Sequence, residues 1–261
     1  MWRNYFKVAL RNISKNRVFT LINVSGLAIG LASSILILLF ILKEKSYDRF
    51  HEHSNQIYRL YIDGGIGDQG FRGAWTSMAM APTFAEEIPE IEKFVRFDVF
   101  NQQLIWYDGE KKIEDHFLFA DSSIFNIFTI NFIQGDPFTA LTRPKSVVIT
   151  REKALEYFGD QNPLGLPLSV NRDSNYYVVT GVIEPLPENS HFFADFIASM
   201  STLEYSREET WFQNSIFSYV LLKPHADPVE VEKKMEEVMQ AHIRGELEAY
   251  LGVGPEEWKA G

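Results

Sequence analysis

Apolar positions dominate one stretch of the chain, an uncharged run of 24 residues from Phe19 to Leu42 that lies between Arg17 and Lys43. A helix of that length rises roughly 36 Å, enough to cross the ~30 Å hydrocarbon core of a bilayer. The small residues at 32–34 are followed by the apolar segment ILILLFIL and not by polar sequence. The run therefore predicts an uncleaved transmembrane helix over residues 19–42 and not a signal peptide.

The residues before this span combine two helical patterns. Apolar side chains recur at steps of three and four, and cations recur at every fourth residue, namely Arg3, Lys7, Arg11 and Lys15. This arrangement predicts a basic amphipathic helix over residues 1–18 on the cytoplasmic leaflet, with these cations at the cytoplasmic interface. The simpler alternative is that the cations only set the topology of the span.

Small residues recur within the span. Gly26, Gly30 and Ser34 are spaced four apart, which places them on one face of a helix. Small side chains let a second helix approach closely, so this face predicts a packing site for a partner helix. The alternative is that the run is incidental, because Gly and Ser are common in transmembrane helices.

Short strands and helices alternate after the span. Alternation and turn residues predict strands over 56–62, 71–76, 91–99, 104–107, 112–119, 129–132, 146–149, 176–183, 193–200 and 217–223. Helices are predicted around Pro82 to Ile88, over 150–159 and over 227–243. Thr150 should cap the second of these and Gly159 should end it in a left-handed conformation, while Asp227, Pro228 and Glu230 should begin the third with a capping box. Residues 43–58 contain little Gly or Pro, which favours a continuous stalk beyond the membrane.

Charge adds an orientation. Five cations and no acidic residue precede the span, whereas both signs mix after it, so the N-terminus should be cytoplasmic and residues 43–261 should lie outside the cytoplasm. Without those five cations, 20 Lys and Arg residues face 35 Asp and Glu residues, a formal charge of −15. This negative charge argues against binding to nucleic acid or to anionic lipid. Cysteine is absent, which excludes disulfides, thiolate metal sites and cysteine catalysis.

Candidate chemistry is sparse. Residues 65–70 spell G-x-G-x-x-G, but a strand and not a helix should follow, so a flexible hairpin tip is favoured over a dinucleotide site. His51 and His53 cannot share a helical face, which argues against a metal pair. His116 is expected in a strand, and no Ser/His/Asp set can be assembled by spacing. No catalytic, cofactor-binding or metal-binding residue is therefore predicted.

Five separated blocks then stand in a characteristic order: SYDRFHEHSNQIYRLY, APTFAEEIPEIEKFVRF, FADSSIFNIFTINFIQGDPFTALTRPKSVVITREKALEYFGDQNPLGLPL, YYVVTGVIEPLPENSHFFADFIASM and FSYVLLKPHADP. Together with the amino-terminal RNYFKVALRNISKNRVFTLINVSGLAIGLA, they resemble the amino-terminal part of a MacB/FtsX-type ABC transporter permease. The resemblance covers residues 1 to about 243.

The resemblance implies an α+β fold. One N-terminal transmembrane helix would precede a two-lobed extracytoplasmic domain over 43–261, the MacB-like periplasmic core domain. A porter-like α/β lobe would comprise about 46–100 and 190–245, and a mainly β lobe of about 103–187 would be inserted into it. The predicted order of elements is compatible with this division.

The resemblance also implies a function in the bacterial inner (plasma) membrane. A permease subunit would couple ATP hydrolysis by a separate cytoplasmic ABC ATPase subunit to movement of the extracytoplasmic domain, for export or envelope signalling, without being an enzyme. The chain has no G-x-x-x-x-G-K-[ST] loop of its own. Expected partners are the ATPase, the lipid bilayer, a second permease half in a homodimer or pseudo-dimer, and an envelope protein, but no nucleic acid.

Two further expectations remain open. Related permeases continue with three membrane helices, which residues 244–261 do not contain, so we expect a fragment or a truncated gene product. A membrane-anchored envelope enzyme, or a stand-alone binding or scaffold domain, is the alternative to a permease component. A cluster of perturbed acids and bases in a deep pocket would favour the enzyme.

Overall fold

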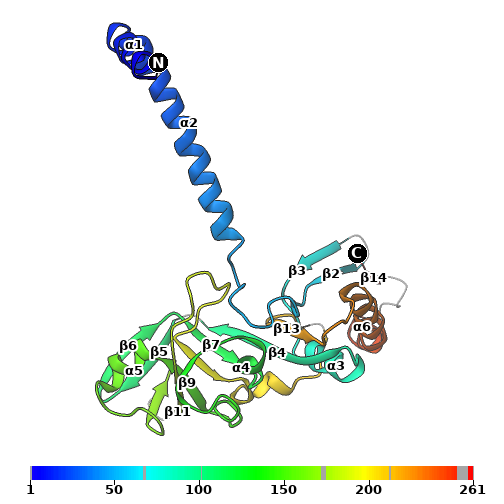
Figure 1. Ribbon diagram of the computed structural model, residues 1–261. Helices are drawn as coiled ribbons and strands as arrows, with labels where there is room; N and C mark the ends of the chain where they lie inside the picture. The colour runs from blue at the N-terminus through cyan, green and yellow to red at the C-terminus, as the bar shows by residue number, and fades with distance from the viewer. Residues whose placement is uncertain are drawn as a thin grey trace. The chain divides into compact units, whose positions relative to one another are not determined.

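The computed structural model of the protein describes residues 2–66, 69–100, 102–171, 175–211, 213–251 and 258–260. The chain forms two compact units, Met1–Arg49 and Phe50–Gly261, which we call the anchor unit and the sheet domain. Figure 1 shows the elements of both.

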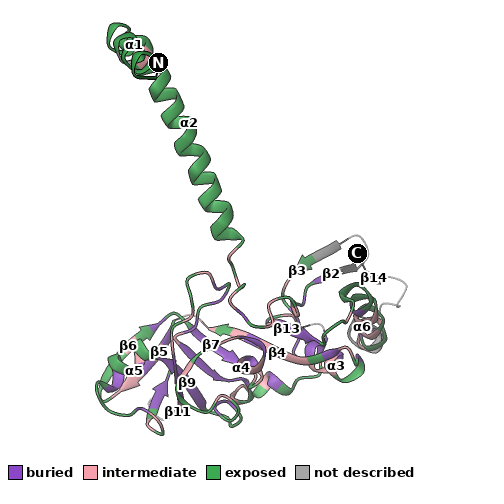
Figure 2. Ribbon diagram, in the orientation of Figure 1, coloured by how far each residue is buried: buried purple, intermediate pink, exposed green. Residues whose placement is uncertain are grey.

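The anchor unit consists of two helices, α1 (Trp2–Lys15) and α2 (Arg17–Glu44). They are separated at Asn16, whose φ of −110° and ψ of 56° are not helical. Among the described residues, α2 is the helix that is long and apolar enough to cross a membrane, which confirms the candidate span. None of its side chains is buried, and Figure 2 shows nearly all of the helix in the colour of exposed residues. Such an exposed apolar surface is suited to lipid or to other membrane helices.

The predicted continuous stalk is wrong. Helix α2 ends at Glu44, and turns occupy residues 45–50 and 52–56. Asp48 has a φ of 57°, a left-handed conformation that Asp tolerates better than most residues. Ser, Asn and Asp in this segment can hydrogen-bond to nearby backbone groups, so the chain turns here without Gly or Pro.

The sheet domain is built on an eleven-stranded mixed sheet with the order β1-β13-β4-β7-β12-β9-β11-β10-β5-β6, in which β8 also pairs with β11. The β7–β12 and β9–β11 pairs are parallel and the other neighbours are antiparallel. The strands are β1 (Ile57–Arg59), β4 (Ile91–Phe100), β5 (Gln103–Tyr107), β6 (Glu110–Glu114), β7 (Phe117–Ala120), β8 (Phe132–Gly135), β9 (Ser146–Thr150), β10 (Pro167–Val170), β11 (Tyr176–Ile183), β12 (Phe196–Ser199) and β13 (Phe217–Leu222).

A small second sheet has the order β14-β2-β3, with β2 (Ile62–Ile66), β3 (Gln69–Gly73) and β14 (Trp258–Ala260). Strands β2 and β3 pair as an antiparallel hairpin, but the strand expected over 56–62 is divided between β1 and β2, and part of the glycine-rich segment expected as the turn lies within β2 and β3. Gly67 and Asp68 lie outside the described residues. The helices of the domain are α3 (Met80–Glu87), α4 (Ile124–Ile127), α5 (Arg151–Phe158), α6 (Pro228–Leu251) and the 3₁₀ turns η1 (Met200–Thr202) and η2 (Glu204–Arg207).

Buried side chains form three clusters along the main sheet, and Figure 2 shows its central strands buried. One cluster joins α5 to β5, β9, β10 and β11, and a second joins α4 to the middle of the sheet. The third packs α3 and α6 against β13, with Phe84, Trp211, Val220 and Val231 all buried. This third cluster fixes the elements that enclose the candidate site.

Local signals account for α5 and α6. The Thr150 hydroxyl accepts a hydrogen bond from the Lys153 amide, and Gly159 follows with the expected positive φ of 58°, although its ψ of −128° is not that of a left-handed helix. Asp227 accepts from the amide of Val229 at 3.0 Å, so it is the predicted N-cap. The Glu230 side chain does not form the predicted capping box. It forms an ion pair with Lys233 instead, at 2.7 Å.

Other sequence predictions required correction. The single strand expected over 112–119 is two strands, β6 and β7, separated at residues 115 and 116, so His116 precedes β7 and does not lie in a strand. Only Phe196–Ser199 of the expected strand 193–200 is extended in the sheet, and β8 begins at Phe132, where the expected strand ends. The alternation of apolar and polar residues does not mark where the chain ends one strand and begins the next at another place in the sheet.

An ionic cluster joins α5 to β6. Lys153 lies 2.6 Å from Glu114 and 3.0 Å from Glu156, and Lys112 lies 2.9 Å from Glu156. The hydrogen bonds from Lys112 and Lys153 lower the pKa of Glu156. Tyr157 donates to Glu114 at 2.7 Å, and burial together with that carboxylate raises the pKa of Tyr157. Each charge therefore has a local partner, which is typical of a structural contact.

Two glycines face each other where β8 meets β11. Gly135 pairs with Gly181, and Gly135 has a φ of 92°. A Cβ at Gly135 would lie 2.5 Å from the carbonyl oxygen of Thr180, and one at Gly181 would lie 2.6 Å from the Phe132 ring. Only residues without a side chain fit at this close approach.

Candidate functional site

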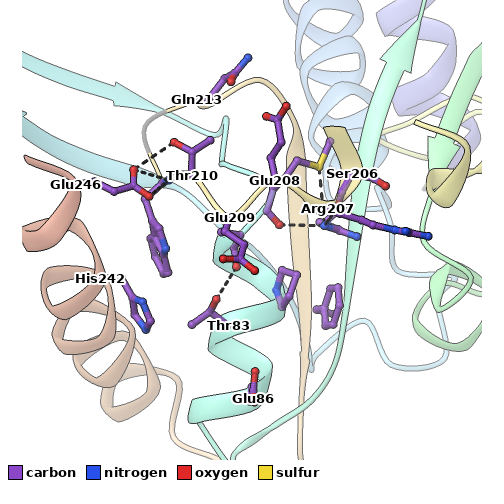
Figure 3. Close-up of a pocket in the computed structure, with 16 residues that line it drawn as sticks. Thr83, Glu86, Ser206, Arg207, Glu208, Glu209, Thr210, Gln213, His242 and Glu246 are labelled. Carbon is purple, nitrogen blue, oxygen red and sulfur yellow. Dashed lines mark hydrogen bonds between the residues drawn. The ribbon is translucent and has the colours of Figure 1, made fainter. Parts of the chain in front are cut away.

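A cleft of about 1270 Å³ opens between α3, β4, α6 and the segment that follows η2. Figure 3 shows Thr83 and Glu86 coming from α3, His242 and Glu246 from α6, and Glu208, Glu209 and Thr210 from the segment after η2. The lining is completed by Met78, Ala79, Pro82, Phe94, Arg96, Ser206, Arg207, Trp211 and Gln213.

Arg96 fixes the β4 side of the cleft. Its Nε and Nη2 each donate to Asp121 at 2.9 Å, and its Nη1 donates to the carbonyl oxygens of Met78 at 3.0 Å and Ser206 at 2.9 Å. The Arg96 side chain is only 12% exposed and the Asp121 side chain only 17%. A bidentate pair of this kind is directional as well as charged, so Arg96 holds the approach to α3 and the η2 turn in place.

The η2 turn has a second contact with β4. The Tyr205 hydroxyl donates to Asp98 at 2.7 Å. Burial raises the pKa of Asp98, and burial together with the Asp98 carboxylate raises the pKa of Tyr205. Two adjacent residues of η2, Tyr205 and Ser206, therefore hold this turn against β4.

The α6 side of the cleft rests on Trp211. The Trp211 ring is buried and stacks on the His242 ring, with centroids 4.9 Å apart and an interplanar angle of 11°. The Glu246 carboxylate accepts from the Trp211 backbone amide at 3.1 and 3.0 Å and from the Thr210 hydroxyl at 3.2 Å. His242 also bonds Glu87 of α3 at 2.7 Å, which joins the two helices across the cleft.

A further ion pair connects α6 to the start of β4. Lys234 hydrogen-bonds to Glu90, and that bond lowers the pKa of Glu90. The walls of the cleft are therefore joined by charged and aromatic contacts between segments far apart in the sequence.

The cleft has the character of a binding site. Its floor is apolar, while Glu86, Glu208 and Glu209 are exposed at its rim. Arg96, Glu246 and His242 are engaged in the contacts that hold the walls. In the part of the chain that was described, no group of three His, Asp or Glu residues is placed to hold a metal ion. The lining can thus offer apolar contact and negative charge to a ligand.

The histidine motif near residue 51 is part of the core packing. His51 is buried, and its Nδ1 accepts the backbone amide of Thr129 at 3.1 Å. The Glu52 amide donates to the Thr129 hydroxyl at 2.8 Å, and the His51 ring lies 4.9 Å from that of Phe128. These contacts fix the turn before β1 against the segment after α4.

The residues predicted to act in the membrane all lie in the anchor unit. Arg3, Lys7, Arg11 and Lys15 are exposed on α1. On α2, a Cβ added at Gly26 or Gly30 would meet no atom of this chain within 4 Å. The Ser34 hydroxyl donates to the Gly30 carbonyl at 2.9 Å. A helix-packing role for this face and an interface role for the cations stay predictions.

The cleft was not found from the sequence, because four segments separated by tens of residues contribute to it. The sequence carries no direct signal for Arg96. It stands within the strand IEKFVRFDV between Val95 and Phe97, which are both buried, so alternation places its side chain on the opposite face of the sheet, where a cation can point to solvent. The sequence does not show that Met78 and the η2 turn contact Arg96 on this face.

The fold and the cleft define a class, a mixed α/β domain with a cleft, on a chain whose described residues also include a helix of membrane length, α2. Residues 20–238 match the family described as MacB-like periplasmic core domain, and the chain belongs to that family. It is thus a component of a MacB-like ABC transporter permease, as the order of its sequence blocks predicted. Such a component implies an ATPase partner.

Solved structures agree with this fold. A domain of a putative permease protein from Porphyromonas gingivalis matches with a TM-score of 0.66 and 23% identity, over 74% of this chain and 84% of that one. The periplasmic region of MacB from Actinobacillus actinomycetemcomitans matches with a TM-score of 0.51 and 16% identity, over 73% and 88% of the two chains. No curated protein sequence matches the chain.

Proposed function

We propose that the chain is a non-catalytic permease subunit whose sheet domain lies outside the cytoplasm and moves when a separate cytoplasmic ATPase hydrolyses ATP. The observation that carries this proposal is the match of residues 20–238 to the periplasmic core domain family, on a chain with a membrane-length helix at α2. The movement would serve export or envelope signalling. The two lobes, of about 46–100 with 190–245 and of about 103–187, would be the parts that move.

Orientation is supported by charge. The five cations that precede the apolar run Phe19–Leu42 are not matched by any acidic residue, which favours a cytoplasmic N-terminus. A reporter enzyme that is active only in the periplasm should be active when fused after residue 243 and inactive when fused before Arg17. The reverse pattern would overturn both the orientation and the proposed function.

Partner helices are supported by the small-residue face of α2. Replacing Gly26 and Gly30 by Leu adds bulk where a neighbouring helix would approach. Because an added Cβ meets no atom of this chain within 4 Å at either position, a defect would report on a neighbour and not on a clash within the chain. We expect the Gly26→Leu/Gly30→Leu permease, assembled with its ATPase, to lose co-purification or stimulated ATP turnover.

The matched control is Ile35→Leu/Ile37→Leu, which changes neither the volume nor the apolarity of α2 appreciably. It should retain both activities at equal expression. Wild-type behaviour of the glycine pair in both assays would show that the face contacts lipid. A second permease half, as homodimer or pseudo-dimer, is the partner that we propose for this face.

A further inference from the structure

We infer that the cleft between α3, β4 and α6 binds a peptide segment of a partner protein that presents a Lys or Arg side chain between apolar residues. The inference rests on the proposed function only in placing the sheet domain where such a partner can reach it.

The charge of the lining is negative. Glu86, Glu208 and Glu209 are exposed at the rim, and Figure 3 places them on two separate walls, α3 and the segment after η2. The Arg96 charge is neutralised by its bidentate contact with Asp121. Arg207 is the other cation of the lining, and Figure 3 shows it on the side away from α6. Three exposed carboxylates against one exposed guanidinium leave the rim net negative, and a concave surface with an excess of one sign of charge attracts the opposite charge.

The floor of the cleft offers apolar contact. Met78, Ala79 and Trp211 are buried, and Pro82 and Phe94 are half-buried. The stacked His242 ring covers one face of Trp211 and holds its orientation. Pro82 and Phe94 are the floor side chains that a ligand can still cover, and a ligand with a single charge and no apolar part would leave them in contact with water. Apolar side chains on either side of the cation would cover them.

The size of the cleft favours a peptide over a small molecule. Its volume of about 1270 Å³ exceeds the ~300–1,000 Å³ that is typical of sites for drug-sized ligands. Glu208, the first residue after η2 on one of its walls, has extended backbone angles, with φ −65° and ψ 135°. A cleft of this size can accommodate several consecutive residues of a chain.

The test uses the full chain in nanodiscs of zwitterionic lipid, so that probe peptides have no charged membrane to bind. Three fluorescent hexapeptides with blocked ends, differing only in a central Lys, Gln or Glu between leucines, are titrated by anisotropy. We expect the Lys peptide to bind at least tenfold more tightly than the Gln peptide, the Glu peptide not to bind, and added salt to weaken the Lys peptide.

Variants assign the binding to the cleft. Glu86→Gln/Glu208→Gln/Glu209→Gln keeps the shape of the rim and removes its charge, and it should weaken the Lys peptide at least tenfold. The control removes three exposed carboxylates that do not line the cleft, with Glu92→Gln/Glu152→Gln/Glu188→Gln, and should change the affinity less than twofold. Equal melting temperatures of the two variants confirm that both are folded.

Several outcomes would overturn the inference. These are equal binding of the three peptides, no binding of any of them, or an unchanged affinity in the rim variant. Phenethylamine is a small cation with an aromatic ring. If it binds as tightly as the Lys peptide, the ligand of the cleft is a small cation and not a peptide segment. None of these results would alter the reporter or ATP-turnover assays, so the proposed function can fail or succeed independently.

Discussion

The Arg96–Asp121 pair offers the sharpest test of how the cleft is held together. Asp121→Asn replaces a carboxylate oxygen by an amide group, whose N–H donors would face the donors of Arg96 now 2.9 Å away. Removing one partner of a fully buried ion pair costs about 3–5 kcal/mol. Because these side chains are 12% and 17% exposed, water screens part of that loss, and we expect about 2–3 kcal/mol.

That loss should be visible in thermal unfolding. For a domain of this size, each kcal/mol lowers the melting temperature by about 2–4 °C, so Asp121→Asn should melt about 4–12 °C below the wild type. Near-ultraviolet circular dichroism of the full chain in nanodiscs measures this, since its aromatic side chains lie mainly in the sheet domain.

The chain provides a matched control. Asp63 pairs with Arg72 at 3.0 Å in the β2–β3 hairpin, with the same chemistry but with side chains that are 40% and 72% exposed. Exposed pairs contribute about 0–1 kcal/mol, so Asp63→Asn should lower the melting temperature by less than about 4 °C. Equal shifts for the two variants would refute the argument that burial makes the Arg96 contact strong.

Two further predictions concern packing and titration. Gly135→Ala should destabilise the domain more than Gly109→Ala. Both positions have positive φ, but a Cβ at Gly135 would lie 2.5 Å from the Thr180 carbonyl oxygen, whereas a Cβ at Gly109 would meet no atom within 4 Å. Equal melting temperatures of the two variants would contradict this prediction. Ultraviolet titration should find phenols that stay protonated in the folded chain above pH ~10, where ordinary tyrosines ionise, because burial raises their pKa. The stability linked to these groups is present below pH ~10 and is lost as the pH rises further. The residues are Tyr157, Tyr177 and Tyr205. Ionisation of all eleven tyrosines together in the folded chain would contradict the prediction.

The elements that the sequence predicted well are those with local causes. Thr150 and Asp227 cap their helices through bonds to residues two or three positions later, so a short window contains the whole signal. The apolar run of α2 is likewise readable by itself. The break between β6 and β7 is different, because β6 lies at the edge of the sheet and β7 beside β4 and β12. Strand β7 is a run of four apolar residues that are all buried, and such a run does not indicate which strands lie on either side of it.

The cleft could not be predicted for a related reason. Arg96, Asp121 and the Ser206 carbonyl meet only because β4, the end of β7 and the η2 turn converge in the folded chain. The same holds for Trp211, whose position depends on His242 and Glu246 of α6. Contacts between distant segments leave no spacing in the sequence that could reveal them.

The short strand β1 has a mechanical consequence. It is the first strand after the turns that follow α2, it lies at the edge of the main sheet, and it pairs with β13 over three residues, Ile57–Arg59. The next ladder, between β13 and β4, extends from Phe217 to Leu222. A tension applied along residues 45–50 would first meet the His51 and Glu52 contacts with Thr129 and then the β1–β13 ladder. Because that ladder is shorter than the β13–β4 ladder behind it, β1 should separate from the sheet before β13 does.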